Sequence, residues 1–139
     1  YTTLFRSVMV NIFNNLKNAQ VKKRIALRFG LQLKVFNSWM TIITLTRNSC
    51  CHHARVWNKQ NTMLPMVPHR TTHAWIILPS NPLRVYYNLC IIKYFLDTIS
   101  PNNDMGKKLR DLLSAFPLVD PAPMGFPEGW ENEELWKIG

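Results

Sequence analysis

The sequence predicts an all-α fold that ends in an irregular tail rich in proline and tryptophan. Its 139 residues are enough for one small domain with a buried core. An apolar fraction of 47% and five tryptophans indicate a folded chain, because disordered chains contain few aromatic residues. Apolar residues recur at three- and four-residue steps in several segments, which is the period of a helix with one buried face.

Two helices are predicted at the start of the chain. The first spans Leu4 to Leu16, where the apolar residues are Leu4, Phe5, Val8, Met9, Ile12, Phe13 and Leu16. The second spans Ala19 to Phe29 and is followed by Gly30, a residue typical of helix ends. Its basic face contains Lys22, Lys23, Arg24 and Arg28. Such a face suits contact with RNA or simple exposure to solvent.

A long third helix is predicted from about Leu33 to Lys59, because neither proline nor glycine interrupts this stretch. One stripe of it is expected to face the core: Trp39, Ile43, Thr46, Cys50, His53 and Trp57. A polar stripe on another side comprises Asn48, His52, Arg55 and Lys59. On this reading His53 is a core histidine and His52 an accessible one.

The second half of the chain is expected to contain two further helices. Residues 60–82 contain four prolines and predict an irregular connection with a short extended piece at Trp75 to Leu78. Leu83 to Ile99 is apolar almost all round and predicts a buried helix, and Met105 to Phe116 predicts a shorter one. We expect a helical domain at residues 1–116 and a strap at residues 117–139 packed on that domain. The strap's anchors would be Phe126, Trp130 and Trp136.

The charges are distributed very unevenly along the chain. Residues 1–96 carry 13 Lys/Arg and no Asp/Glu, whereas residues 97–139 carry 4 Lys/Arg and 8 Asp/Glu, which gives formal charges of +13 and −4. The basic part indicates a polyanionic partner such as RNA. Solubility, or contact with an acidic segment elsewhere, is the alternative explanation. The absence of acidic residues before Asp97 disfavours a two-metal nuclease, whose ions need several carboxylates.

The segment Arg47-Asn48-Ser49-Cys50-Cys51-His52-His53-Ala54-Arg55 carries the groups best suited to chemistry. Cleavage of RNA without a metal requires deprotonation of the 2′-hydroxyl, stabilisation of the phosphorane and protonation of the leaving oxygen. Histidine can move these protons and arginine can hold two phosphate oxygens. The hypothesis therefore assigns Arg47, Asn48 and His52 to the catalytic site.

A single regular helix does not bring Arg47 and His52 together. With ~100° of rotation per residue, their side chains point about 140° apart. Either the helix bends locally, or two copies of the segment meet in a homodimer and each supplies part of the site. We favour the dimer, because a polar stripe flanked by apolar residues is typical of a self-associating helix.

Other site classes have weaker support in the sequence. Cys50 with His53, and His69 with His73, are possible zinc ligands, but adjacent ligands on one helix point in different directions. Otherwise Cys50 is expected to be a small core residue. Three cysteines form no disulfide framework, and no apolar run is long enough to cross a bilayer. We therefore expect a cytoplasmic protein without cofactors.

The central segment resembles the signature of Abi-like (abortive infection) proteins, a branch of the HEPN superfamily. The residues that carry the resemblance are Arg47-Asn48-x-Cys50-x-His52-His53-x-Arg55-x-Trp57-Asn58. The surroundings agree: Ser38-Trp39, Tyr86-Tyr87 to Asp97, Ser100-Pro101-Asn102-Asn103, and the ending Met124-Gly125-Phe126-Pro127 with Trp130 and Trp136. Cys51 stands where the family usually has alanine. Members are generally longer and this chain does not begin with methionine, so we expect the C-terminal fragment of a longer protein.

The resemblance implies a dimerising HEPN-type helical bundle and a metal-independent endoribonuclease that acts as a toxin in bacterial anti-phage defence. It implies Arg47 and His52 as the catalytic pair, with Asn48 in support. We expect Arg55, Lys59 and the basic residues Lys22, Lys23, Arg24 and Arg28 to guide RNA. Some HEPN proteins bind RNA without cutting it, and relatives in this branch are thought to associate with a small non-coding RNA. The alternative function is therefore a non-catalytic RNA-binding module.

Overall fold

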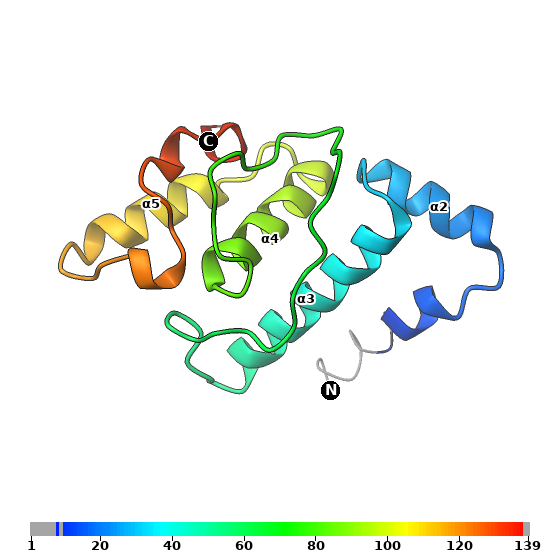
Figure 1. Cartoon of the computed structure of the whole chain (residues 1–139), viewed down its shortest axis with the longest axis horizontal. Coiled ribbons are helices and arrows are strands. Elements are labelled where there is room, and N and C mark those ends of the chain that lie inside the picture. The colour runs from blue at the N-terminus through cyan, green and yellow to red at the C-terminus, as the bar shows by residue number, and fades with distance from the viewer. Residues whose placement is uncertain (1–7, 9, 138–139) are drawn as a thin grey trace. The chain divides into compact units, whose positions relative to one another are not determined.

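The computed structural model describes residue 8 and residues 10–137 of the chain (Figure 1). These residues contain helices and no β-strand, which confirms the all-α class. The α-helices are α2 (Ala19–Arg28), α3 (Leu33–Cys51), α4 (Val85–Ile99), α5 (Met105–Ala115) and α6 (Glu134–Lys137). Two short 3-10 helices, η1 (Ala122–Met124) and η2 (Trp130–Asn132), precede α6. Within the described part of the chain, no helix is both long enough and apolar enough to cross a bilayer.

The chain divides into two compact units. Unit 1 comprises Tyr1–Val56 and Met63–His73, and unit 2 comprises Trp57–Thr62 and Ala74–Gly139. Both sides of the expected boundary between residues 116 and 117 lie in unit 2. That boundary, and the single domain at residues 1–116, stay predictions.

The two N-terminal helices of unit 1 follow the sequence pattern closely. Residues 10–14 are helical, whereas residues 4–7 and 9 of the first predicted helix lie outside the described part. Asn18 starts α2, since its Oδ1 accepts hydrogen bonds from the N–H groups of Gln20 (2.9 Å) and Val21 (3.4 Å). After α2, Gly30 has a φ of +65°, and a Cβ built on it would lie 1.6 Å from Thr72 Oγ1. Only glycine fits this helix end.

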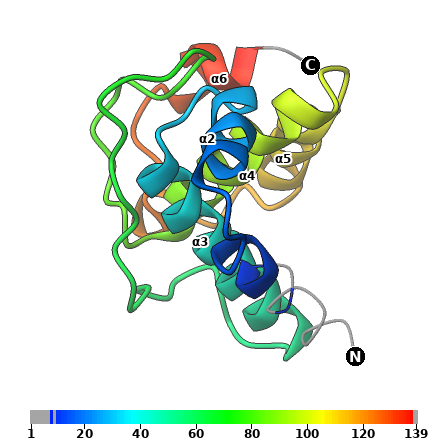
Figure 2. The ribbon, with the colours of Figure 1, turned by 90° about the vertical axis from the view of Figure 1, so that its right-hand side faces the viewer.

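The interior of unit 1 lies between residues 10–14, α2 and α3. Phe36 is buried, and its ring centroid lies 5.1 Å from that of Phe13 and 5.3 Å from that of Phe29. Figures 1 and 2 show residues 10–14 running beside α3. Ser38 and Trp39 hold a distant loop, because Ser38 Oγ accepts from the Met66 N–H and Trp39 Nε1 donates to the Met66 carbonyl, both at 2.9 Å.

Helix α3 ends at Cys51 and not at Lys59, so the predicted length of this helix was wrong. Its buried residues stop at Ile42, and beyond that point burial no longer favours extension of the helix. The core-facing stripe is confirmed at Trp39, whereas Cys50, His53 and Trp57 are exposed. The polar stripe is not a helical stripe either, since His52, Arg55 and Lys59 follow the end of the helix.

Helix α4 forms the interior of unit 2. The prediction of a buried helix at Leu83 to Ile99 is confirmed, since nine of its residues are buried. The tail packs on it as expected: the Tyr86 ring centroid lies 4.7 Å from that of Phe126 and 6.3 Å from those of Trp130 and Trp136. On another side, Trp75 meets Tyr87 edge-on at 5.6 Å. Aromatic residues between positions 75 and 136 thus build one core.

Polar groups are also paired inside unit 2. The buried carboxylate of Glu133 accepts hydrogen bonds from the N–H groups of Ile77 (3.0 Å) and Leu78 (2.5 Å). It holds the segment predicted to be extended, which is irregular and forms no strand. Lys93 is buried and forms an ion pair with Asp97, whose Oδ1 also accepts from Asn103 Nδ2 at 2.7 Å. These contacts tie the turn after α4 to the helix.

Candidate functional site

Arg47 and Asn48 lie together near the C-terminal end of α3. Arg47 Nη1 donates a hydrogen bond to Asn48 Oδ1 at 3.3 Å, and both side chains are half-buried. The bond holds the planar guanidinium beside the Asn48 side chain. The structure therefore brings together two of the three predicted catalytic residues.

His52 follows this pair as the C-cap of α3. Its N–H donates to the Asn48 carbonyl at 3.0 Å, and its side chain is exposed. The backbone stays near helical at His52, with φ −90° and ψ 15°. The rotation of ~100° per residue therefore still applies, and Arg47 and His52 point about 140° apart. The homodimer, in which a second chain would supply the missing group, stays a prediction.

The helix end is closed by a tight cap in which His53 adopts a left-handed conformation with φ +53°. The His53 N–H donates to the Cys50 carbonyl at 3.2 Å, and the Ala54 N–H donates to the Ser49 carbonyl at 2.9 Å. This pair of bonds is a Schellman motif, which usually has glycine at the left-handed position. The carbonyls of Asn48, Ser49 and Cys50 accept hydrogen bonds within the helix end. They therefore need no hydrogen bond from the side chains proposed to bind a ligand.

Unit 1, to which this helix end belongs, has a strongly positive formal charge. It contains ten Lys/Arg and no Asp/Glu, hence a formal charge of +10, whereas unit 2 contains seven Lys/Arg and eight Asp/Glu, hence −1. The C-terminal end of a helix carries a partial negative charge that repels phosphate. Arg47 within the helix and Arg55 beyond it oppose that effect.

The residues predicted to guide RNA have different surroundings. Arg55 is exposed and belongs to unit 1, whereas Lys59 is exposed and belongs to unit 2. Of the four predicted residues on α2, Lys23, Arg24 and Arg28 are exposed. Lys22 is half-buried, and its Nζ donates to the Asn14 carbonyl at 2.6 Å. Arg24 and Arg28 are thus better placed than Lys22 to meet a ligand.

The cysteines and histidines do not assemble a metal site. Within residues 8 and 10–137, no three side chains among His, Cys, Asp and Glu form a group that could hold a metal ion. Cys50 and Cys51 are exposed, so the expectation that Cys50 is a core residue was wrong. Cys90 is the buried thiol, and burial raises its pKa to about 12.

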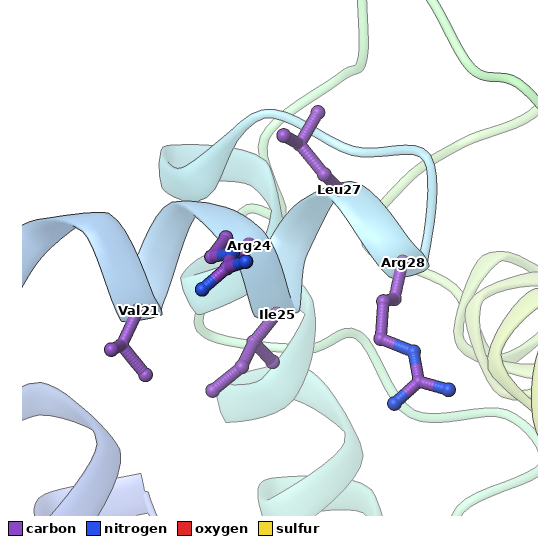
Figure 3. Close-up of a pocket in the computed structure, with 5 residues that line it drawn as sticks. All are labelled: Val21, Arg24, Ile25, Leu27 and Arg28. Carbon is purple, nitrogen blue, oxygen red and sulfur yellow. The ribbon is translucent and has the colours of Figure 1, made fainter.

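Two features of this unit escaped the sequence analysis. One is the cap at His53, since the sequence has no glycine or proline there to indicate the end of the helix. The other is an open groove of about 530 Å³ along α2, lined by Val21, Arg24, Ile25, Leu27 and Arg28 (Figure 3). The spacing of Val21, Ile25 and Arg28 by four and three residues was the signal that could have revealed its wall.

Comparison with known proteins gives one family. Searches of curated proteins and of solved structures found no match. The family model described as Abi-like protein matches residues 3–58. The match includes α2, α3 and the capped end with Arg47, Asn48 and His52. Residues 3–58 are therefore similar in sequence to the Abi-like protein family.

Proposed function

We propose that this protein is a metal-independent endoribonuclease of the HEPN type, acting in the cytoplasm as an RNA-cleaving toxin in abortive infection. One observation carries the proposal: the family-matched segment ends in a capped helix where Arg47 and Asn48 are bonded and His52 is exposed. The sequence of unit 1 contains ten cationic residues and no Asp or Glu. A polyanionic substrate suits this charge.

The proposed chemistry assigns one task to each residue. The Arg47 guanidinium binds the non-bridging phosphate oxygens and stabilises the charge of the phosphorane. Asn48 Oδ1 orients the guanidinium through the 3.3 Å bond. His52 accepts the proton of the attacking 2′-hydroxyl or donates one to the leaving 5′-oxygen. The products are a 2′,3′-cyclic phosphate and a free 5′-hydroxyl.

A homodimer would complete the site. One imidazole serves only one of the two proton transfers in a single step, and Arg47 and His52 of one chain diverge on the helix. Two α3 ends in contact would supply a histidine for each transfer and an arginine beside each histidine. The exposed His52 at the end of α3 is accessible for such a contact.

Incubation of the purified protein with structured and single-stranded RNA in EDTA tests the proposal. We expect cleavage to persist under chelation and to fall by about 10²- to 10⁴-fold in His52→Ala, as is typical when a general acid or base is removed. His69→Ala is the matched control, since His69 is exposed in unit 1 outside the motif. Loss of cleavage in EDTA would refute the metal-free mechanism, and full activity of His52→Ala would refute the site.

The same assay separates the alternative function from the first. A non-catalytic module that binds a small non-coding RNA would give salt-sensitive binding and no product. In that case Arg47→Ala would weaken binding. The unmodified protein and His52→Ala would both show no cleavage. Sequencing the RNA that copurifies from the host would identify the bound molecule.

A further inference from the structure

We infer that the groove along α2 binds an unpaired nucleotide of RNA, as a subsite separate from the capped end of α3. The inference rests on the proposed function, because it names a second contact for the same ligand. The groove holds about 530 Å³ and is open to solvent, and all five lining residues belong to α2 (Figure 3). Its lining joins two arginines with three aliphatic side chains.

The arrangement of the side chains suits a nucleotide. In Figure 3, Val21, Ile25 and Arg28 project to the same side of α2, and Arg24 projects in front of them. Arg24 and Arg28 are four residues apart and therefore lie one above the other on the helix. The aliphatic wall can contact the face of a base while the guanidinium groups hold the neighbouring phosphates or stack on the base.

The charges near the groove favour a polyanion. Arg24 and Arg28 are exposed, and the sequence of unit 1 contains no Asp or Glu that could pair with them. The groove therefore keeps its positive potential, which draws phosphate groups toward it. An acidic ligand with an apolar part fits both kinds of lining residue, and an unpaired nucleotide is such a ligand.

The apolar side chains of α2 do not form the continuous stripe that a membrane-bound helix needs. Leu27 is 71% exposed and projects away from Ile25 in Figure 3, while Ala26 is buried against the interior of unit 1. A helix that lies in a lipid interface presents its apolar residues on one face. Unpaired bases are also accessible to side chains, whereas the bases of an RNA duplex are largely hidden.

Binding of a fluorescent single-stranded oligoribonucleotide to the purified full chain tests the inference. The double variant Arg24→Gln/Arg28→Gln should weaken binding at least about tenfold and lower the salt slope by about 1.4, the value for two lost phosphate contacts. The matched control is Lys17→Gln/Lys34→Gln, which removes the same charge from exposed positions of unit 1 outside the groove. It should weaken binding less than about threefold. A duplex of the same sequence should compete poorly.

Each outcome has a distinct meaning once circular dichroism shows that the variants are folded. If both double variants weaken RNA binding equally, the groove is not the binding site, because binding would then follow net charge alone. Equal competition by the duplex would overturn an unpaired nucleotide as the ligand. If the unmodified protein binds no RNA, the proposed function fails together with the groove. If it binds and cleaves while Arg24→Gln/Arg28→Gln is unchanged, only the groove fails.

Discussion

Unit 1 contains ten Lys/Arg and no Asp/Glu, whereas unit 2 contains seven Lys/Arg and eight Asp/Glu. In unit 2 the charges serve the structure: Glu133 is buried against two backbone N–H groups, and Lys93 is buried beside Asp97. In unit 1 no carboxylate can neutralise the cations, so their field is available to a ligand. The difference shows that unit 2 uses charged groups in buried contacts, whereas the cations of unit 1 have no carboxylate in their own unit.

The aromatic core of unit 2 should dominate its stability. Trp136 is fully buried, its ring centroid lies 5.5 Å from that of Trp130, and its Nε1 donates to Tyr86 Oη at 3.2 Å. We expect Trp136→Ala to lower the free energy of unfolding by about 3–5 kcal/mol, measured by urea denaturation. Trp57→Ala, at a residue 49% exposed in the same unit, should cost less than about 1 kcal/mol. Similar losses in the two variants would show that the cluster is not the core.

The buried carboxylate of Glu133 allows a sharper test of structural charge. Glu133→Gln replaces one acceptor oxygen with an NH₂ group that faces the N–H groups of Ile77 and Leu78. We expect a loss of about 1.5–3 kcal/mol and faster hydrogen exchange at those two amides. The neighbouring Glu134 is exposed, so Glu134→Gln should change stability by less than about 0.5 kcal/mol. An equal effect of both substitutions would mean that the carboxylate does not hold the segment.

The buried hydroxyl of Tyr87 is expected to lower the stability of unit 2. This hydroxyl has no hydrogen-bond partner among the described residues, which typically costs about 1–3 kcal/mol. We expect Tyr87→Phe to raise the free energy of unfolding by about 1 kcal/mol, with the ring still edge-on to Trp75. Tyr86→Phe is the opposite control, because it removes the acceptor for Trp136 Nε1 and should lower stability. A loss of stability in Tyr87→Phe would show that the hydroxyl is satisfied.

The same residue gives a dependence on pH. Burial, together with the nearby Cys90, raises the pKa of Tyr87 to about 12. The unfolded chain releases this proton at its ordinary pKa of about 10, so stability is complete below that pH and is lost as pH rises toward 12. A plot of the free energy of unfolding against pH should therefore fall less steeply between pH 10 and 12 in Tyr87→Phe than in the unmodified protein.

Local patterns predicted most of the helices. The α2, α4 and α5 segments and the aromatic anchors of the tail were found because their periodicity and apolar content are visible within a few residues. The end of α3 was missed because its stop is a left-handed His53, and a sequence without glycine or proline at this point gives no local signal. The exposure of Cys50 and Trp57 follows from the same error, since both were assigned to a stripe that the helix does not continue.

The candidate site was predicted only as far as a single helix can define it. The proximity of Arg47 and Asn48 follows from their adjacency, and the hydrogen bond between them agrees with it. The groove on α2 is open because no other segment in the described part of the chain lines it. Residue spacing alone does not predict which face of a helix stays uncovered. In the proposed homodimer Arg47 would meet His52 of a second chain, and no periodicity within one chain could predict such a contact.

The smallest expected effect concerns the cap at the proposed site. An L-residue in the left-handed region costs roughly 1–2 kcal/mol, and glycine relieves that cost but loses more entropy on folding. We expect His53→Gly to raise the free energy of unfolding by about 0.5–1 kcal/mol. His52→Gly is the matched control, because His52 has an ordinary φ of −90° and glycine there should destabilise by a similar amount. If cleavage survives His53→Gly but not His52→Gly, His53 serves only to close the helix. The strain at His53 then belongs to the cap that leaves His52 exposed. Equal stability changes in the two variants would contradict the left-handed cap.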